Sequence, residues 1–183
     1  MEPYNQIRRR DRAVTDEAWI KEFLRRAPFG ALATVYDGQP FINTNLFAYD
    51  EAAHALYLHT ANHGRTRTNV EAGGRVCFSA GRMGRLLPAD TALEFSVEYA
   101  EVRVFGCAQV IDDPAEAEYG LQLLLDKYFP HLRPGKDYRS IQPEELRRTA
   151  VYRIDIESWS AKQKKAAPEF PGAFCYQGEE ESS

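Results

Sequence analysis

Apolar and polar residues alternate along much of this chain, and that two-residue period is typical of β-strands with one buried face. Six segments show the pattern, at residues 30–36, 40–49, 55–60, 75–80, 93–111 and 149–158. Asp37-Gly38 separates the first two, and this dipeptide favours a tight hairpin turn. We therefore expect six strands, of which the first two form an antiparallel hairpin.

The fifth segment, 93–111, is long and its alternation changes phase. Apolar side chains occupy odd positions from Leu93 to Tyr99 and even positions from Val102 to Val110. A phase change within one strand indicates a bulge or a sharp bend, which is how a strand turns the corner of a barrel.

Helical signals are fewer, and they consist of capping residues, prolines and apolar residues at helical spacing. The best is Asp113-Pro114 followed by Glu116, because aspartate, proline and glutamate suit the first turn of a helix. Residues 81–92, rich in glycine and exposed-looking leucine, are expected to form a loop. Helices are expected from Thr15 to about Arg26, after Gly64, from Asp113 to Pro130 and from Pro143.

The order of these elements indicates the fold class. Strands do not alternate with helices, and the chain contains no GxGxxG motif, so a doubly wound dinucleotide-binding fold is excluded. We predict a mainly β protein, a small six-stranded antiparallel barrel with peripheral helices. A length of 183 residues suits one domain, placed at 1–165 with an N-terminal helical arm. Residues 166–183 form a tail that ends in the acidic run 179–181 and is expected to be partly disordered.

Net charge, hydrophobicity and the cysteines indicate which kinds of partner and which cellular compartment suit this chain. The formal net charge is −4, so no overall basic field favours nucleic acid, and no apolar run approaches the roughly 20 residues of a membrane span. The N-terminus lacks a secretory apolar core. Three widely spaced cysteines without a CxxC motif favour a reducing cytoplasm over a disulfide framework or a zinc site.

The segment 59–69, HTANHGRTRTN, carries the strongest candidate chemistry. It follows an apolar strand with hydroxyl, amide and glycine residues and then Arg65 and Arg67, just before a predicted helix start. Unpaired N–H groups at a helix N-terminus and arginine side chains both bind anions. The alternative is a polar turn with solvated arginines, and this segment by itself favours neither.

Three other features admit two interpretations each. Asn43 and Asn45 share a strand face that suits a planar hydrogen-bonding ligand, or they face solvent. His59 and His63 have ligand-like spacing, but no third ligand accompanies them, so we predict no metal site. The basic run that contains Lys162 and Lys164 either closes over an anionic cofactor or is a solvated tail.

Together these features resemble the split-barrel flavoproteins related to pyridoxamine 5'-phosphate oxidase, especially the nitroimidazole-resistance (Nim) branch. The resemblance covers roughly residues 12–165. It is carried by RRRDRAV, FGALATVYDGQPFINTN, LYLHTANHGRTRTN, SVEYAEVRVFGCAQV, LLDKYFP and VYRIDIESWSAKQKK, in that order.

The resemblance implies a homodimer of six-stranded split barrels that binds FMN at the subunit interface. Thr60, the turn from Ala61 through His63 to Gly64, and Arg65 would hold the FMN phosphate, with Thr66 and Asn69 as additional contacts. Asn43, Thr44 and Asn45 match the strand along which the isoalloxazine lies. His59 matches a histidine near the cofactor and is the candidate catalytic residue. Lys162 and Lys164 match a basic motif that either subunit can supply.

The implied activity is an FMN-dependent oxidoreductase that uses NAD(P)H to reduce a small electrophile such as a nitroaromatic. The oxidase branch has further basic residues where this chain has Asn43, Asn45, Asn62 and His63, so pyridoxamine phosphate oxidation is not expected. Two alternatives remain. One is a haem-binding or haem-degrading split barrel with His59 or His63 on the iron, and the other is a flavin-binding protein without turnover.

Overall fold

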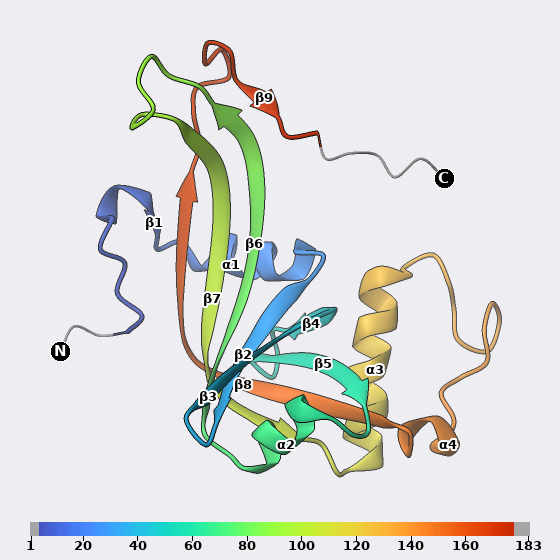
Figure 1. Cartoon of the computed structure of the whole chain (residues 1–183). Helices are drawn as coiled ribbons and strands as arrows, with labels where there is room; N and C mark the ends of the chain where they lie inside the picture. Colours follow the sequence, from blue (N-terminus) through green and yellow to red (C-terminus); the bar gives the residue numbers. More distant parts are fainter. Residues whose placement is uncertain (1–3, 178–183) are drawn as a thin grey trace.

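The computed structural model of the protein describes residues 4–177 and has the mainly β architecture that the alternation predicts (Figure 1). The strands are β1 (Ala13–Val14), β2 (Gly30–Tyr36), β3 (Gln39–Asn45), β4 (Phe47–Asp50), β5 (Ala55–Ala61), β6 (Arg75–Leu87), β7 (Ser96–Val110), β8 (Thr149–Lys164) and β9 (Phe174–Cys175). The helices are α1 (Glu17–Arg26), α2 (Arg65–Glu71), α3 (Pro114–Tyr128) and α4 (Pro143–Leu146), with a 3-10 turn at Arg10–Arg12.

All strand pairs are antiparallel, and the strands form one curled sheet in the order β3-β2-β6-β7-β8-β5-β4. The lower halves of β6, β7 and β8 belong to the barrel, and their upper halves continue together as a long blade (Figure 1). Short strands β1 and β9 pair with β8 and β6. The result is the predicted antiparallel barrel with peripheral helices.

The sheet has nine strands in the described residues, whereas the sequence predicted six. The predicted strand 40–49 is interrupted at Leu46, where the chain passes from β3 to β4. Predicting a loop at 81–92 was wrong over its first half, because β6 continues to Leu87 along the blade. β1 and β9 contain two residues each, too few for periodicity to reveal.

Local chemistry explains the helix ends. Asp113 accepts a hydrogen bond from the Glu116 N–H at 3.0 Å, so the predicted cap of α3 is confirmed. The cap of α1 is Asp16, not the expected Thr15, because the Asp16 carboxylate reaches the Ala18 N–H at 2.9 Å. The Asp37-Gly38 hairpin is confirmed, with left-handed φ values of 50° and 71°.

The bend between barrel and blade is made by a bulge, although not in the predicted strand. Phe105 of β7 pairs with Ser158, but the next residue, Gly106, pairs with Ile156, which leaves Glu157 of β8 without an opposite residue. β7 itself keeps one alternation through the bend, with Ala100 and its even-numbered successors facing the core. The phase change that the sequence shows therefore has another cause.

The cause is that apolar side chains also lie on the second face of the blade, which is turned away from the core. Tyr99 lies opposite the core side, where the Arg12 guanidinium donates to its hydroxyl at 3.3 Å and Lys162 lies 5.7 Å from its ring. Leu93 and Phe95 precede β7 and are exposed. Of the odd-numbered apolar residues, Val97 and Tyr99 therefore lie partly buried on the second face of the blade, and Leu93 and Phe95 lie outside the strand.

The core fills the barrel and continues under α1. Leu32, Phe47, Phe78, Leu56 and Tyr152 are completely buried in it. A smaller cluster around Tyr57 packs α3 on the outer side of β5. No helix in the described residues is long and apolar enough to cross a membrane.

Residues 166–177 return along the blade. The Ala166 N–H donates to Glu98 at 2.8 Å, and Arg85 donates to the carbonyls of Ala167 and Pro168. Arg85 also pairs with Glu98 at 2.9 Å, and that bond holds the pKa of Glu98 down to about 2. The acidic run 179–181 lies outside the described residues.

Candidate functional site

The β3 strand presents Asn43 toward α2. Asn43 pairs with Leu32 of β2, and since paired residues of an antiparallel sheet share a face, Asn43 faces the core side. Its amide donates to the Thr66 hydroxyl at 2.8 Å, and Thr66 is buried. This bond joins the strand predicted to carry a flavin ring to the helix predicted to carry its phosphate.

Asn45 and Thr44 differ in their surroundings. Thr44 pairs with Ala31 and is exposed on the opposite face. Asn45 lies on the Asn43 face, and its amide nitrogen is buried without a hydrogen-bond partner in the described residues. A buried donor without a partner is costly. Asn45 therefore suits a ligand that supplies a carbonyl or ring-nitrogen acceptor, as the flavin ring does.

The turn between β5 and α2 combines an anchored hydroxyl with open backbone. The Thr60 hydroxyl lies 2.8 Å from that of Tyr152 and donates to the Ala61 carbonyl. Ala61, His63 and Gly64 are exposed, and Gly64 precedes α2 with φ of 139°, a value that favours glycine. Because α2 spans only seven residues, anion binding here depends chiefly on side chains.

The structure distinguishes the two arginines of the turn. Arg67 donates to Glu71 at 2.6 Å and to Asn62, so its charge is already compensated. Arg65 is exposed, and its guanidinium carbon lies 5.9 Å from the centre of the Tyr36 ring. In the described residues it makes no ion pair and no side-chain hydrogen bond. Arg65 is therefore the cation of this turn that remains available for a phosphate.

Thr66 and Asn69 have buried side chains rather than open ones. Asn69 is 2% exposed and donates to the Thr34 hydroxyl at 2.8 Å. Both residues fix α2 against the β2–β3 hairpin. As built, they position the turn, and direct contact with a cofactor stays a prediction.

His59 lies on the outer face of β5, as the sequence predicts. Its neighbours Leu56 and Leu58 point into the core, whereas Tyr57 and His59 point the other way. His59 is exposed and makes no side-chain hydrogen bond in the described residues, but nearby protein atoms partly desolvate it. This desolvation lowers the pKa of His59, so the ring is mostly neutral at pH 7.

The comparisons with known proteins agree with this geometry. Residues 16–163 match the family model described as pyridoxamine 5'-phosphate oxidase. The chain belongs to this family. A search of curated proteins finds no significant match.

Three solved structures have folds similar to that of this chain. The flavocytochrome Anf3 from Azotobacter vinelandii is 22% identical, with 95% of this chain and 85% of that chain covered and a TM-score of 0.76. An FAD and haem binding protein from Mycobacterium smegmatis is 23% identical (86% and 76% covered, TM-score 0.75). A candidate 5-nitroimidazole antibiotic resistance protein from Bacteroides thetaiotaomicron is 18% identical (82% and 86% covered, TM-score 0.68). At these identities the likeness shows the fold, the split barrel of the pyridoxamine 5'-phosphate oxidase family.

In this family member, the end of β8 lies on the blade, away from α2 (Figure 1), and Lys162 and Lys164 are among the last residues of that strand. Thr60 pairs with Ala150 on β8, so twelve residues of strand and a bend separate that level from Lys162. Lys162 pairs with Glu101 at 3.2 Å, and Lys164 donates to Ser96. The two lysines and the α2 turn of one chain therefore do not form a single site.

Sequence reasoning missed the groups around Lys162. Arg12 and Tyr99 lie beside it, and Glu101 also pairs with Arg103. The signal was present in β7, where Tyr99, Glu101 and Arg103 alternate on one face. The ion pair with Glu101 partly neutralises the charge of Lys162.

Proposed function

We propose that the protein is an FMN-dependent oxidoreductase that works as a homodimer with the cofactor at the subunit interface. The observation that carries the proposal is the bond between Asn43 and Thr66, which joins the strand of Asn45 to the helix of Arg65. Within residues 4–177 the amide nitrogen of Asn45 has no hydrogen-bond partner and Arg65 makes no ion pair. A cation that can bind a phosphate and an amide N–H that can bind a ring acceptor suit a ligand that has an anionic tail and a planar head.

Each residue has a distinct part in this proposal. Arg65 and the backbone of the Ala61–Gly64 turn bind the phosphate, since arginine binds phosphate through two parallel hydrogen bonds. Asn45 donates to the ring and holds its orientation. Bound there, the flavin would take electrons from NAD(P)H and deliver them to a small electrophile such as a nitroaromatic.

The proposed dimer would bring Lys162 and Lys164, which lie far from the α2 turn of their own chain, to a cofactor site. Because these lysines lie on the blade of their own chain, they complete a cofactor site only if the blade packs against the α2 turn of a second copy. The charge around Lys162 stays positive on balance, because Arg12 and Arg103 lie near Glu101, the carboxylate that pairs with Lys162.

Anaerobic addition of NADPH to the flavin-loaded protein tests the oxidoreductase. Bleaching of the flavin bands, followed by recovery on adding a nitroaromatic, is the expected result. A protein whose flavin is not reduced by NADPH or NADH would instead be a flavin-binding protein without this turnover.

His59→Ala is expected to lower turnover of the nitroaromatic roughly tenfold and to leave flavin affinity unchanged, because one hydrogen bond to the substrate is lost. The lowered pKa of His59 makes it a neutral hydrogen-bonding group at pH 7. If it also protonates the substrate, the wild-type rate rises as the pH falls toward the lowered pKa of His59, and the rate of the variant does not. Wild-type values for both turnover and flavin affinity in His59→Ala would show that the assignment is wrong.

A haem protein is the second candidate, and two structurally similar proteins favour it. One is a flavocytochrome and the other binds FAD and haem. Here His59 and His63 are exposed and their rings make no hydrogen bond in the described residues, so either ring nitrogen is free to bind iron. Haem would add a Soret band to the absorption spectrum, and His59→Ala or His63→Ala would remove it. Extraction and mass measurement of the flavin separate FMN from FAD.

A further inference from the structure

We infer that the groove between α1 and β6, on the barrel side of the blade, binds a small planar aromatic anion such as an aromatic carboxylate. The cavity has a volume of about 280 Å³ and is lined by Trp19, Glu22, Phe23, Arg26, Ala27, Pro28, Gly81 and Arg82. This volume suits a ligand with a single ring.

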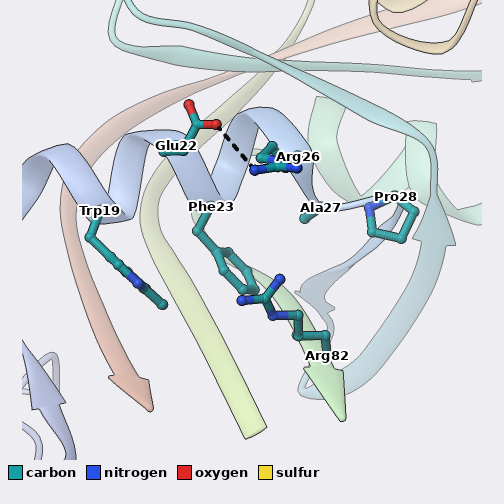
Figure 2. A pocket seen from close by; sticks show the side chains of 8 residues that line it. Trp19, Glu22, Phe23, Arg26, Ala27, Pro28 and Arg82 are labelled. Carbon is teal, nitrogen blue, oxygen red and sulfur yellow. Dashed lines mark ion pairs between the residues drawn. The ribbon is translucent and has the colours of Figure 1, made fainter. Parts of the chain in front are cut away.

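The wall of the groove is aromatic. Trp19 and Phe23 lie one turn apart on α1 and stack with their ring centroids 5.2 Å apart and their planes at 19°. Figure 2 shows both rings pointing from the helix toward the strands of the blade, with Phe23 next to Arg82. Phe23 is buried, whereas Trp19 keeps part of its surface in the groove. A flat ring can therefore pack against Trp19 without displacing the core.

Arg82 supplies the charge that an anion needs. It pairs with Ala100, so its side chain leaves β6 on the face that α1 covers. Its guanidinium carbon lies 5.6 Å from the Phe23 ring centre (Figure 2). Stacking on an aromatic ring holds a guanidinium while its N–H groups stay free to bind a carboxylate. Arg82 makes no ion pair and no side-chain hydrogen bond elsewhere in the described residues, so this capacity is unused.

Glu22, also in the groove wall, is the one group that opposes an anion. Its carboxylate lies 3.9 Å from Arg26, which also lines the groove and offsets its charge, and 3.4 Å from Arg25, which pairs with Glu51 as well. With Arg82 added, the groove keeps a positive balance. An aromatic wall and a free, preoriented arginine then select a ring that carries a carboxylate over a neutral ring or a small anion without a ring.

The test uses the two tryptophans of the chain, Trp19 and Trp159, which give two indole N–H signals in a proton–nitrogen NMR spectrum. Trp159→Phe assigns them. Benzoate should shift the Trp19 signal to saturation with a dissociation constant of roughly 1 mM, as expected for so small a ligand. Benzamide and acetate, which lack the charge and the ring respectively, should bind at least about tenfold more weakly.

Arg82→Gln should weaken benzoate binding at least about tenfold, since a charge-assisted pair is lost. Arg82→Lys should give an intermediate affinity, and the matched control Arg148→Gln, an exposed arginine on the α4 side, should equal the wild type. Equal binding of benzamide, an unchanged affinity in Arg82→Gln, or no shift of the Trp19 signal would each overturn the inference. Benzoate binding at this groove does not require a flavin, so the result stands or falls separately from the proposed function.

Discussion

Arg65→Ala is expected to weaken flavin binding by about 1.5–3 kcal/mol, which corresponds to roughly 10- to 150-fold in dissociation constant. The reason is that Arg65, the first residue of α2, makes no ion pair within residues 4–177, whereas the charge of Arg67 is compensated by Glu71. Riboflavin lacks the phosphate, so its affinity should be the same for the wild type and the variant. Titration of the flavin-free protein with FMN and with riboflavin, followed by flavin fluorescence, measures both affinities.

Arg148→Ala is the matched control for charge. Arg148 is exposed close to the same turn, and its backbone carbonyl accepts a hydrogen bond from the Asn62 N–H at 3.3 Å. Its loss should change the affinity for FMN by less than about 0.5 kcal/mol, as expected for a solvated charge. An equal loss of affinity in both variants would mean that general electrostatics, and not a phosphate site at Arg65, attracts the cofactor.

Gly106→Ala is expected to lower the free energy of unfolding by about 3 kcal/mol or more. A Cβ atom at Gly106 would lie 1.8 Å from the carbonyl oxygen of Asp155, a backbone atom inside the sheet that cannot rotate away. This glycine pairs with Ile156, next to the bulge residue Glu157 of β8, where the barrel turns into the blade. Urea unfolding followed by circular dichroism measures the change.

Gly81→Ala is the control for that substitution. Gly81 also lies in a strand of the blade, but its added Cβ would meet its nearest atom, the Ala100 carbonyl oxygen, at an ordinary 3.6 Å. Its effect should stay within about 1 kcal/mol. If the two variants unfold alike, close packing at the bulge does not determine the bend.

Alternation with a period of two was sufficient to predict the antiparallel barrel, because one face of each strand is buried in a common core. The hairpin at Asp37-Gly38 and the start of α3 at Asp113 follow from local chemistry and were predicted correctly. The blade was not predicted. Glycine and polar residues end a strand in most contexts, but in β6 they continue it, because β7 supplies a partner as far as Leu87.

The candidate site shows the same division between local and distant information. The sequence placed His59 outward from the alternation of its own strand, and the structure agrees. Our sequence analysis did not tell Arg65 from Arg67, although Glu71 lies four residues after Arg67, a spacing that pairs charges on one helix. The contact of Arg65 with Tyr36 is distant in sequence and depends on the fold. Nor could the sequence show that α1 and β6 meet around Arg82, because their separation along the chain carries no periodic signal.

The absorption spectrum of the purified protein after incubation with FMN and removal of unbound ligand tests the central claim most directly. The account predicts flavin bands with about one flavin per chain, at a stoichiometry that Arg65→Ala reduces. A protein that retains neither FMN nor FAD under these conditions, or that shows only a Soret band, would contradict a flavin site formed by Asn43, Asn45 and Arg65.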